Sequence, residues 1–346
     1  MHTHTAIHSV AAAFMLLLAP FTRGADRYAD LDSAKYLGAP TVEATVAGAK
    51  PFTEGPAVDA HGNVFFTNTG EILKFSPTTK ELAVFRKPSN GANGSCFDST
   101  GRLLNCEAGD GSKGRVTRTD LKSGAIEVLC DSFGGFPLGA PNDLTTDSKG
   151  RIYFTSRLPN TDPAKGNVNA VYRIDPDWKT SRILASPDID MPNGLAVSPD
   201  DRTFYLIESD GRADRARNIR AYDLQPDGTV VNTRVIINFS PGRGGDGMRL
   251  DEQGNLYVAA GLHKTRGTSE TLDTRPGIHV FSPQGKLLAF AQTPEDTLTN
   301  CAFGGTDLRT LYVTCGKFLL SMRTTIPGQP RYRIGTAPGK PKAAGD

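Results

Sequence analysis

A short fragment recurs six times along the chain, and it constrains the fold more than any other feature. Each copy has an amide or acid residue, usually a small residue next, then an alternating strand, a turn rich in Asp and Gly, and a second strand. The copies begin at Glu54, Asn93, Asn142, Asn193, Asp246 and Asn300. Their starts lie 39 to 54 residues apart. A β-rich unit of this period is typical of a propeller with one four-stranded blade per repeat, so we predict an all-β, six-bladed β-propeller.

The sixth repeat and the segment before the first repeat together predict how the ring closes. The sixth repeat supplies three clear strands, TNCAFGG, TLYVTC and FLLSMRTT. An unpaired sheet edge favours aggregation, so a fourth strand is expected from elsewhere. Residues 41–48, TVEATVAG, alternate between apolar and polar side chains. We predict that this segment is the outer strand of the last blade, within a single propeller domain of residues 25–346.

Residues 1–24 have the character of a secretory signal peptide. The run AIHSVAAAFMLLLAPF is apolar, and small residues precede Ala25. Lys and Arg are absent before this run, so a short buried or anchoring helix is the alternative. With about 16 apolar residues the run is short for a bilayer span, and no later stretch is longer. We therefore expect a periplasmic or secreted protein with no stable membrane span.

Composition excludes several classes of function. The net charge is +2 without a long basic run, which argues against nucleic-acid binding. Five cysteines are an odd number, so at least one stays unpaired within the chain. Cys301 and Cys315 lie on consecutive strands of one repeat, where they either pair after export or stay buried as small apolar side chains. No CxxC, HExxH, GxSxG or Walker motif is present, which argues against Cys/His zinc sites, serine nucleophiles and phosphate loops.

The residues that open the six repeats are candidates for a metal site. The first strand of a propeller blade lines the central channel, so these side chains are expected to form a ring of two carboxylates and four amides. Such a set of oxygens suits Ca²⁺ better than zinc or copper, while Mg²⁺ prefers to keep its waters. The alternative interpretation is that NG and DG are turn formers repeated with the fold. That alternative does not explain Glu54.

Longer fragments resemble a known family. The fragments are FTEGPAVDAHGNVFFTN, APNDLTTDSKGRIYFTS, MPNGLAVSPDDRTFYLIES, GGDGMRLDEQGNLYVAAG and NCAFGGTDLRTLYVTCG, which together span roughly residues 50–325. They look like the gluconolactonase/senescence-marker-protein/luciferin-regenerating family. The resemblance implies a six-bladed propeller with one divalent cation, often Ca²⁺, at the mouth of the channel, and hydrolysis of lactones or esters.

The resemblance also implies roles for individual residues. The metal ligands of the family fall on Glu54, Asn193 and Asp246, and a further ligand or substrate contact falls on Asn142. Ca²⁺ is the expected ion, with Mg²⁺, Mn²⁺ or Zn²⁺ as alternatives. Some members carry an Arg two residues before that Asn to hold a sugar hydroxyl, but this chain has Ala140. Three arginines are candidates to replace it: Arg157, Arg243 and Arg249.

Catalysis and substrate binding are assigned to the same end of the channel. A bound cation would polarise a lactone carbonyl, and Asp246 is the expected general base. Two long connections, residues 157–171 and 261–280, leave the ends of second strands and should overhang one face of the ring. His263 on the second connection is the alternative proton acceptor. The predicted substrate-binding residues are Asn93, Asn142, Asn300 and His263.

The predicted function is metal-dependent hydrolysis of a sugar lactone such as glucono-1,5-lactone, with a small-molecule lactone or ester as the only expected partner. One alternative is an aryl-ester or phosphotriester hydrolase on the same scaffold, which should have a more apolar mouth than the polar loops of this chain indicate. The other is a non-catalytic propeller that binds a ligand and uses Ca²⁺ for stability, because fold alone does not decide function.

Overall fold

The computed structural model describes residues 26–111, 113–158, 164 and 166–329. The predicted signal peptide, residues 1–24, lies outside these ranges, and export therefore remains a prediction. The chain divides into two units between Asp30 and Leu31, and the fold given below is that of the second unit. The described residues contain no helix that is long and apolar enough to span a membrane.

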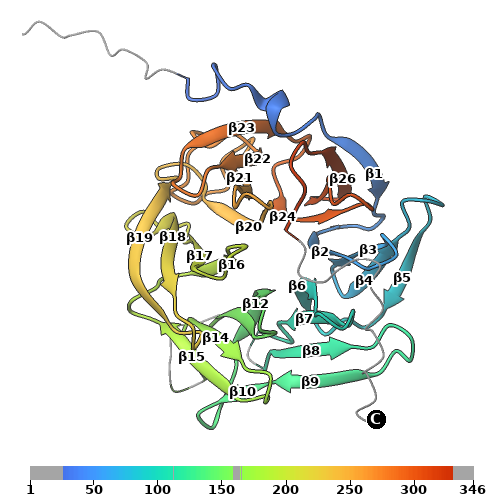
Figure 1. Cartoon of the computed structure of the whole chain (residues 1–346), viewed down its shortest axis with the longest axis vertical. Helices are drawn as coiled ribbons and strands as arrows, with labels where there is room; N and C mark the ends of the chain where they lie inside the picture. The colour runs from blue at the N-terminus through green and yellow to red at the C-terminus, as the bar shows by residue number, and fades with distance from the viewer. Residues whose placement is uncertain (1–25, 112, 159–163, 165, 330–346) are drawn as a thin grey trace, which may run out of the picture. The chain divides into compact units, whose positions relative to one another are not determined.

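Six four-stranded antiparallel sheets form the blades of a β-propeller, as predicted from the repeats (Figure 1). The first blade consists of β2 (Thr53–Val58), β3 (Val64–Asn68), β4 (Glu71–Phe75) and β5 (Leu82–Arg86). The second consists of β6 (Ala92–Phe97), β7 (Leu103–Glu107), β8 (Arg115–Thr119) and β9 (Ile126–Cys130). The third consists of β12 (Ala140–Thr146), β13 (Ile152–Arg157), β14 (Ala170–Ile174) and β15 (Thr180–Ala185).

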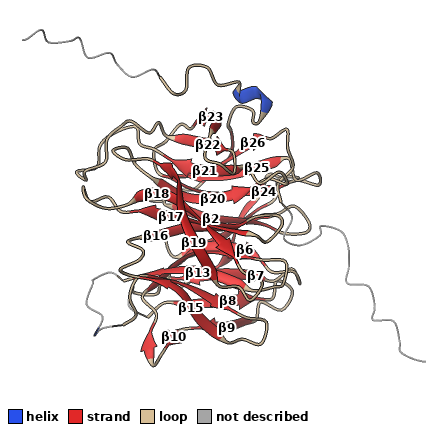
Figure 2. Ribbon diagram, turned by 60° about the vertical axis from the view of Figure 1, so that its left-hand side comes forward, coloured by secondary structure: helices blue, strands red, loops and turns tan. Residues whose placement is uncertain are grey.

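The other three blades follow the same order of strands. The fourth consists of β16 (Pro192–Val197), β17 (Thr203–Ser209), β18 (Arg217–Leu224) and β19 (Val230–Asn238). The fifth consists of β20 (Gly245–Leu250), β21 (Leu256–Ala260), β22 (Gly277–Phe281) and β23 (Leu287–Gln292). The sixth consists of β24 (Leu298–Gly304), β25 (Thr310–Cys315), β26 (Phe318–Arg323) and β1 (Thr41–Thr45). Outside the blades lie the hairpin β10 (Ser132–Phe133) and β11 (Phe136–Pro137) and the 3₁₀ turn η1 (Ser33–Lys35), which is drawn in blue in Figure 2.

The sixth blade combines the two ends of the repeat region. Its strand order is β1-β26-β25-β24, and Thr41 of β1 lies opposite Ser321 of β26 in an antiparallel ladder. The outer edge of β26 is therefore covered by a strand that precedes the first repeat, which removes an unpaired edge. β1 is shorter than the predicted strand of residues 41–48, and the following Val46 is buried and donates its backbone N–H to the carbonyl of Lys317.

Neighbouring blades pack through apolar side chains on alternate strand positions. Aromatic pairs mark several of these contacts: Phe65 and Phe97 join the first two blades with ring centroids 5.7 Å apart, and Tyr153 and Phe204 join the third and fourth at 5.5 Å. Edge-to-face and tilted pairs of this kind contribute beyond the area they bury. The second strand of each blade directs apolar side chains toward both neighbouring blades. Its side chains are therefore almost completely buried.

The turn between the first two strands is stabilised locally. Asp59 and Asp98 each accept hydrogen bonds from the backbone N–H groups two and four residues later, at 2.8 to 3.0 Å. Asp147 and Asp251 do the same in their repeats. A short carboxylate that bonds its own backbone favours a tight turn, and the Gly that follows accommodates the reversal. The predicted DAHG, DSTG, DSKG and DEQG turns therefore have a direct physical cause.

All five cysteines lie in the described part of the chain, and none forms a disulfide. Cys301 Sγ contacts the carbonyl of Tyr257, whereas Cys315 Sγ contacts the carbonyl of Glu295. In the β24–β25 ladder Cys301 lies opposite Val313, and Cys315 lies opposite Leu298. The pairing considered from the sequence is therefore not present, and both side chains serve as small buried residues.

Candidate functional site

Each inner strand is irregular at the residue that opens its repeat. The pairing of β2 with β3 shifts register between Glu54 and Ala57, and that of β16 with β17 shifts between Pro192 and Leu195. Similar shifts occur in β6, β12 and β20, while the shift in β24 lies just before its ring residue, between Leu298 and Asn300. A bulge re-aims a side chain that a regular strand would direct along the sheet normal. Bulges next to the repeat openings therefore help to direct polar side chains toward the channel, a feature that alternation in the sequence does not reveal.

The residue after the ring position must usually be small. A Cβ atom on Gly55 would lie 2.0 Å from the carbonyl oxygen of Asn93, and one on Gly194 would lie 2.5 Å from that of Asp246. In the four repeats with Gly at this position, the inner strand thus touches the ring residue of the next blade, and only Gly allows this approach. The third and sixth repeats depart from the pattern, because Asp143 and Cys301 stand at this position.

Five of the six ring residues line one cavity of about 370 Å³. These five are Glu54, Asn93, Asn142, Asn193 and Asp246. The remaining lining residues are Phe52, Arg157, Ser209, Gly211, Arg243, Thr268 and Glu270. The lining is almost entirely polar or charged, and Thr268 and Glu270 come from the long connection after β21, as expected. The other long connection lies partly outside the described residues.

Glu54 is the most deeply placed carboxylate of this cavity, with 3% of its surface exposed. The backbone N–H of Gly55 donates to its Oε2. Burial, followed by the negative charges of Asp246 and Asp143, raises the pKa of Glu54 well above its usual range. A buried carboxylate in this situation is destabilised unless a positive charge is bound beside it.

Asp246 accepts two hydrogen bonds across the cavity wall. Its Oδ2 lies 2.8 Å from Arg243 Nη2, and its Oδ1 lies 2.7 Å from Asn193 Nδ2. Asn193 also donates to Ser209 Oγ at 2.9 Å. Arg243 is held by the carbonyl of Leu298 at 3.2 Å. Each oxygen of the predicted general base thus accepts one hydrogen bond and keeps a second lone pair that can accept a proton.

The amide oxygens of Asn93 and Asn142 are buried and accept no hydrogen bond from any described residue. An unsatisfied buried acceptor costs about 1–3 kcal/mol, so two beside one cavity require a reason. A hard cation would satisfy both, because Ca²⁺ is bound by amide and carboxylate oxygens. No three His, Cys, Asp or Glu side chains among the described residues are arranged to hold a metal ion. The candidate set fits such an ion through amides combined with Glu54 and Asp246.

Asn300, the sixth ring residue, is fully buried below the cavity and does not line it. Its Nδ2 lies 3.0 Å from Asp143 Oδ2 and 3.4 Å from Glu54 Oε2, and its Oδ1 accepts from the backbone N–H of Cys301. Asp143 in turn lies 3.6 Å from Arg249 Nη1. Burial raises the pKa of Asp143, while Arg249 and Asn300 oppose that shift. Asn300 therefore donates to Glu54 from the side away from the cavity. The predicted contact between Asn300 and the substrate has no support from this geometry.

His263 and the three candidate arginines occupy different places. His263 is exposed, its Nε2 lies 3.0 Å from the carbonyl oxygen of Thr293, and it does not line the cavity. Arg249 does not line it either, whereas Arg157 and Arg243 do. Arg157 ends β13 directly opposite Ala140 in the ladder with β12. The cavity thus receives a guanidinium from the strand next to the one where the family resemblance placed it.

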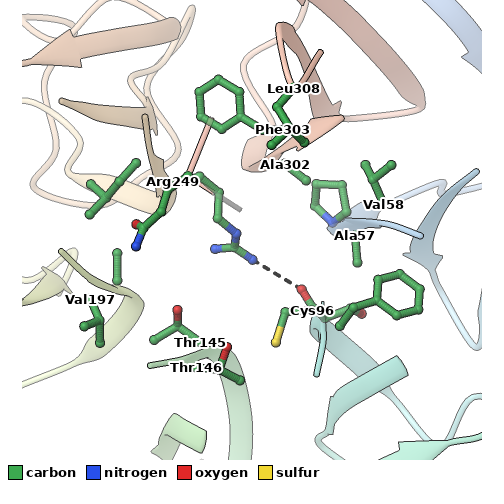
Figure 3. Close-up of a pocket in the computed structure, with 16 residues that line it drawn as sticks. Ala57, Val58, Cys96, Thr145, Thr146, Val197, Arg249, Ala302, Phe303 and Leu308 are labelled. Atoms are coloured by element: carbon green, nitrogen blue, oxygen red, sulfur yellow. Dashed lines mark hydrogen bonds between the residues drawn. The ribbon is translucent and has the colours of Figure 1, made fainter. Parts of the chain in front are cut away.

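A second cavity of about 110 Å³ lies at the opposite end of the inner strands (Figure 3). Its lining includes Val58, Phe97, Val197 and Phe303, which follow the ring residues on the same strands. Arg249 is the one charged lining residue, and it donates to the carbonyls of Met248 and Ser95 at 2.8 and 3.2 Å. Because this cavity is apolar and its guanidinium is already bonded, it lacks the groups that hydrolysis requires.

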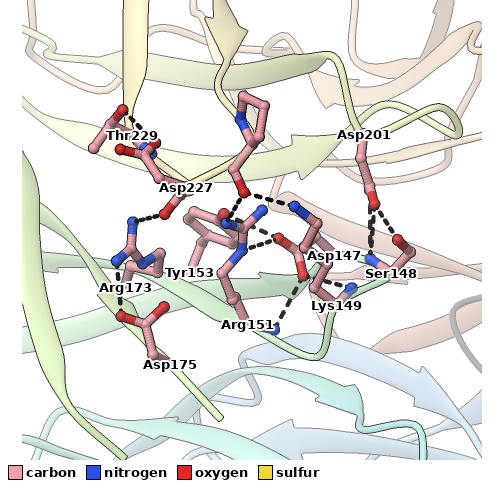
Figure 4. Close-up of polar contacts among 11 residues, drawn as sticks. Asp147, Ser148, Lys149, Arg151, Tyr153, Arg173, Asp175, Asp201, Asp227 and Thr229 are labelled. Atoms are coloured by element: carbon pink, nitrogen blue, oxygen red, sulfur yellow. Dashed lines mark hydrogen bonds and ion pairs between the residues drawn. The ribbon is translucent and has the colours of Figure 1, made fainter. Parts of the chain in front are cut away.

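The densest polar cluster outside the cavities is structural (Figure 4). Asp147 accepts from Arg151 and from the hydroxyl of Tyr153, and Arg151 donates to the carbonyl of Pro226 at 3.0 Å. Arg173 likewise donates to the carbonyl of Asp227 at 2.8 Å. These contacts join the third blade to the turn between β18 and β19. The charges are satisfied within the protein, so the cluster fastens two blades together and offers no open site.

Comparison with known proteins identifies the family. The model of the family described as "SMP-30/Gluconolactonase/LRE-like region" matches residues 52–317. The chain belongs to this family. The resemblance stated from the sequence fragments is thereby confirmed, and the matched region contains all six repeat openings and both long connections.

Individual relatives support the same assignment. The gluconolactonase of Zymomonas mobilis is 28% identical over 302 residues, which cover 79% of this chain and 78% of that protein. Regucalcin of Oryctolagus cuniculus is 32% identical over 183 residues, which cover 51% of this chain and about half (54%) of the length of regucalcin.

Solved structures share the architecture. A gluconolactonase of Xanthomonas campestris has a TM-score of 0.69 at 26% identity and covers 84% of this chain and 91% of its own. A regucalcin of Agrobacterium tumefaciens, described as a calcium-binding protein, has a TM-score of 0.66. It covers 86% of this chain and 96% of its own, and at 16% identity it supports the fold alone.

Proposed function

We propose that the chain hydrolyses lactones with the help of one divalent cation, with Ca²⁺ the first candidate, bound in the 370 Å³ cavity. The observation that carries this proposal is the pair of unsatisfied amide oxygens, Asn93 Oδ1 and Asn142 Oδ1, beside a cavity that also presents the carboxylates of Glu54 and Asp246. The similar proteins described as gluconolactonases support the reaction.

The ion would be held by Glu54, Asn142, Asn193 and Asp246, with Asn93 next to them. Glu54 and Asp246 would supply two negative charges against the two positive charges of the ion, which offsets the cost of burying them. Asn193 would present its amide oxygen in place of the Nδ2 that now contacts Asp246. Asn300 would keep Glu54 in position from below.

When bound, the cation supplies a positive charge that polarises the lactone carbonyl. Asp246 takes the proton of the water that attacks the carbonyl carbon, and Arg243 keeps the carboxylate in place from its other side. As the bond between the carbonyl carbon and the ring oxygen breaks, Asp246 returns the proton to that oxygen. The product is the open-chain hydroxy acid.

The lining favours a hydroxylated substrate. Apart from Phe52 and Gly211, every lining residue carries a polar or charged side chain. An aryl-ester or phosphotriester substrate would be bound better by apolar walls, which are found at the other end of the channel. Sugar lactones match the polar cavity, because their hydroxyl groups can bond to amides, hydroxyls and guanidinium groups.

A pH-indicator assay on glucono-1,5-lactone tests this function. Purified protein is measured after EDTA treatment and again with Ca²⁺, Mg²⁺, Mn²⁺ or Zn²⁺ added back. Activity should be lost with EDTA, return with one cation, and be lost again in Asp246→Asn. Stoichiometric cation binding without turnover of any lactone or ester would contradict the proposal and favour a non-catalytic propeller. Turnover of aryl esters or phosphotriesters alone would show that these compounds, and not lactones, are the substrates.

A further inference from the structure

We infer that the substrate carries an anionic group, either a carboxylate or a phosphate ester, which binds to Arg157 at the side of the cavity. This inference rests on the proposed function and narrows its substrate class. It depends on three features of the described residues: the bonding of Arg157, the charges that line the cavity, and the space left by Ala140.

Arg157 has no ion-pair partner among the described residues. Its Nε donates to the carbonyl of Pro192 at 2.7 Å, while its Nη2 is buried and has no hydrogen-bond partner. It forms no ion pair with any residue that the structure describes, unlike Arg243, which pairs with Asp246 at 2.8 Å. Burial lowers the pKa of Arg157, against the attraction of Asp246 and Glu54. A guanidinium whose buried Nη2 has no acceptor is costly, and a bound anion would supply both the acceptor and the opposite charge.

The charge of the cavity reverses when the cation binds. The charged lining residues are three carboxylates, Glu54, Asp246 and Glu270, and two guanidinium groups, Arg157 and Arg243. The formal charge of the described lining residues is therefore minus one, and a bound divalent cation would change it to plus one. The cation and Arg243 together balance the three lining carboxylates, so one positive charge, equal to that of Arg157, is left over. A neutral lactone leaves this excess unbalanced, whereas an anionic lactone neutralises it.

The position of Arg157 suits recognition of a group on the substrate. It comes from β13, whereas most of the proposed ion ligands come from inner strands. Ala140 lies directly opposite it, so only a methyl group stands on the facing strand position. A guanidinium presents parallel N–H donors that match a carboxylate or phosphate, and a fixed anion would orient the lactone ring toward the ion.

Matched pairs of lactones test this inference. D-glucono-1,4-lactone and D-glucaro-1,4-lactone differ only in a hydroxymethyl group and a carboxylate, and 6-phospho-D-gluconolactone supplies the phosphate arm. With the cation present, wild-type protein should have a kcat/KM for one of the anionic lactones about tenfold or more above that for the neutral one. Which anionic lactone is preferred identifies the group.

Variants separate recognition by Arg157 from general damage. Arg157→Gln should lower the ratio of anionic to neutral kcat/KM by about tenfold to a hundredfold. The matched control is Arg202→Gln, whose side chain is 84% exposed and which does not line the cavity. This control should leave the ratio unchanged. A wild-type ratio of one or less, or an equal loss for all lactones in Arg157→Gln, would overturn the inference while leaving lactone hydrolysis intact.

A binding measurement keeps the inference testable if no lactone is turned over. Calorimetric titration of D-glucarate into the Ca²⁺-loaded protein should show binding that Arg157→Gln weakens by about tenfold or more and Arg202→Gln does not. That result would support the anion site although the proposed reaction had failed. No binding of D-glucarate or of D-gluconate 6-phosphate in this setting would refute it.

Discussion

Substitution of Arg249 by Met tests the charge network beneath the cavity. Arg249 Nη1 lies 3.6 Å from Asp143 Oδ2, and 2% of the Asp143 side chain is exposed. At an effective dielectric constant of about 20, two unit charges at this distance attract by about 5 kcal/mol before desolvation is counted. Removing one partner of a buried pair typically costs about 3–5 kcal/mol, because the other charge is left unpaired. We expect Arg249→Met to lower the free energy of unfolding by that amount at neutral pH.

The sign of the pH dependence follows from Asp143. Burial already raises the pKa of Asp143 in the folded protein, and Arg249 opposes this shift. Without Arg249 the folded pKa rises further above the unfolded value, so the carboxyl binds its proton on folding over a wider range of pH. Stability is therefore lost as pH rises through that range. The deficit of Arg249→Met should be small near the ordinary pKa of Asp and grow toward neutral pH.

Urea unfolding in EDTA at about pH 5 and about pH 7.5 measures both effects. The double variant Asp143→Asn/Arg249→Met should recover part of the loss, because it removes the unpaired carboxylate together with its partner. Three results would refute the reasoning. The loss of unfolding free energy in Arg249→Met could be below about 1 kcal/mol at neutral pH, it could be independent of pH, or the double variant could fail to relieve it.

Three further predictions concern the ion, the ring and its closure. Burial raises the pKa of Glu54, and the ion requires the ionised carboxylate, so Ca²⁺ should raise the melting temperature more at about pH 7.5 than at about pH 5. Glu54→Gln should remove most of this difference. An equal rise in melting temperature at both pH values would contradict this prediction. Gly194→Ala should lower the free energy of unfolding by about 1–3 kcal/mol and weaken cation binding, because its Cβ would lie 2.5 Å from the Asp246 carbonyl oxygen. The control Gly38→Ala should do neither, because its Cβ meets nothing closer than 3.7 Å. Deleting residues 31–46 should lower the melting temperature by about 10 °C or more, because β26 loses its partner β1; unchanged melting would show that this pairing is dispensable.

Much of the fold could be predicted from the sequence because its determinants are local and repeated. Alternating strands, Asp-Gly turns and the fixed period indicate blades, and the incomplete sixth repeat points to a strand from the N-terminal side. The ring positions follow from the same repetition, and the structure brings five of them into one cavity. Where each side chain points depends on the bulges, which arise from hydrogen bonding between strands and leave no mark in the alternation.

The parts of the site that escaped prediction depend on contacts between distant segments. Asp143 could have been noticed, since it replaces the Gly found after most ring residues, but its bonds to Asn300 and Arg249 come from other blades. Arg157 was one of three open candidates, and only the pairing of β12 with β13 places it opposite Ala140. His263 was selected as a titratable loop residue, but the loop turns its ring to the carbonyl of Thr293.

Calorimetric titration of Ca²⁺ into EDTA-treated, dialysed protein at neutral pH measures whether the cavity binds a cation. We expect one ion per chain, with heat that depends on the buffer because binding releases a proton. Glu54→Gln should abolish or greatly weaken this binding, and the surface variant Arg202→Gln should preserve it. The absence of specific binding by Ca²⁺, Mg²⁺, Mn²⁺ and Zn²⁺ to the wild-type protein, or full affinity in Glu54→Gln, would contradict the account.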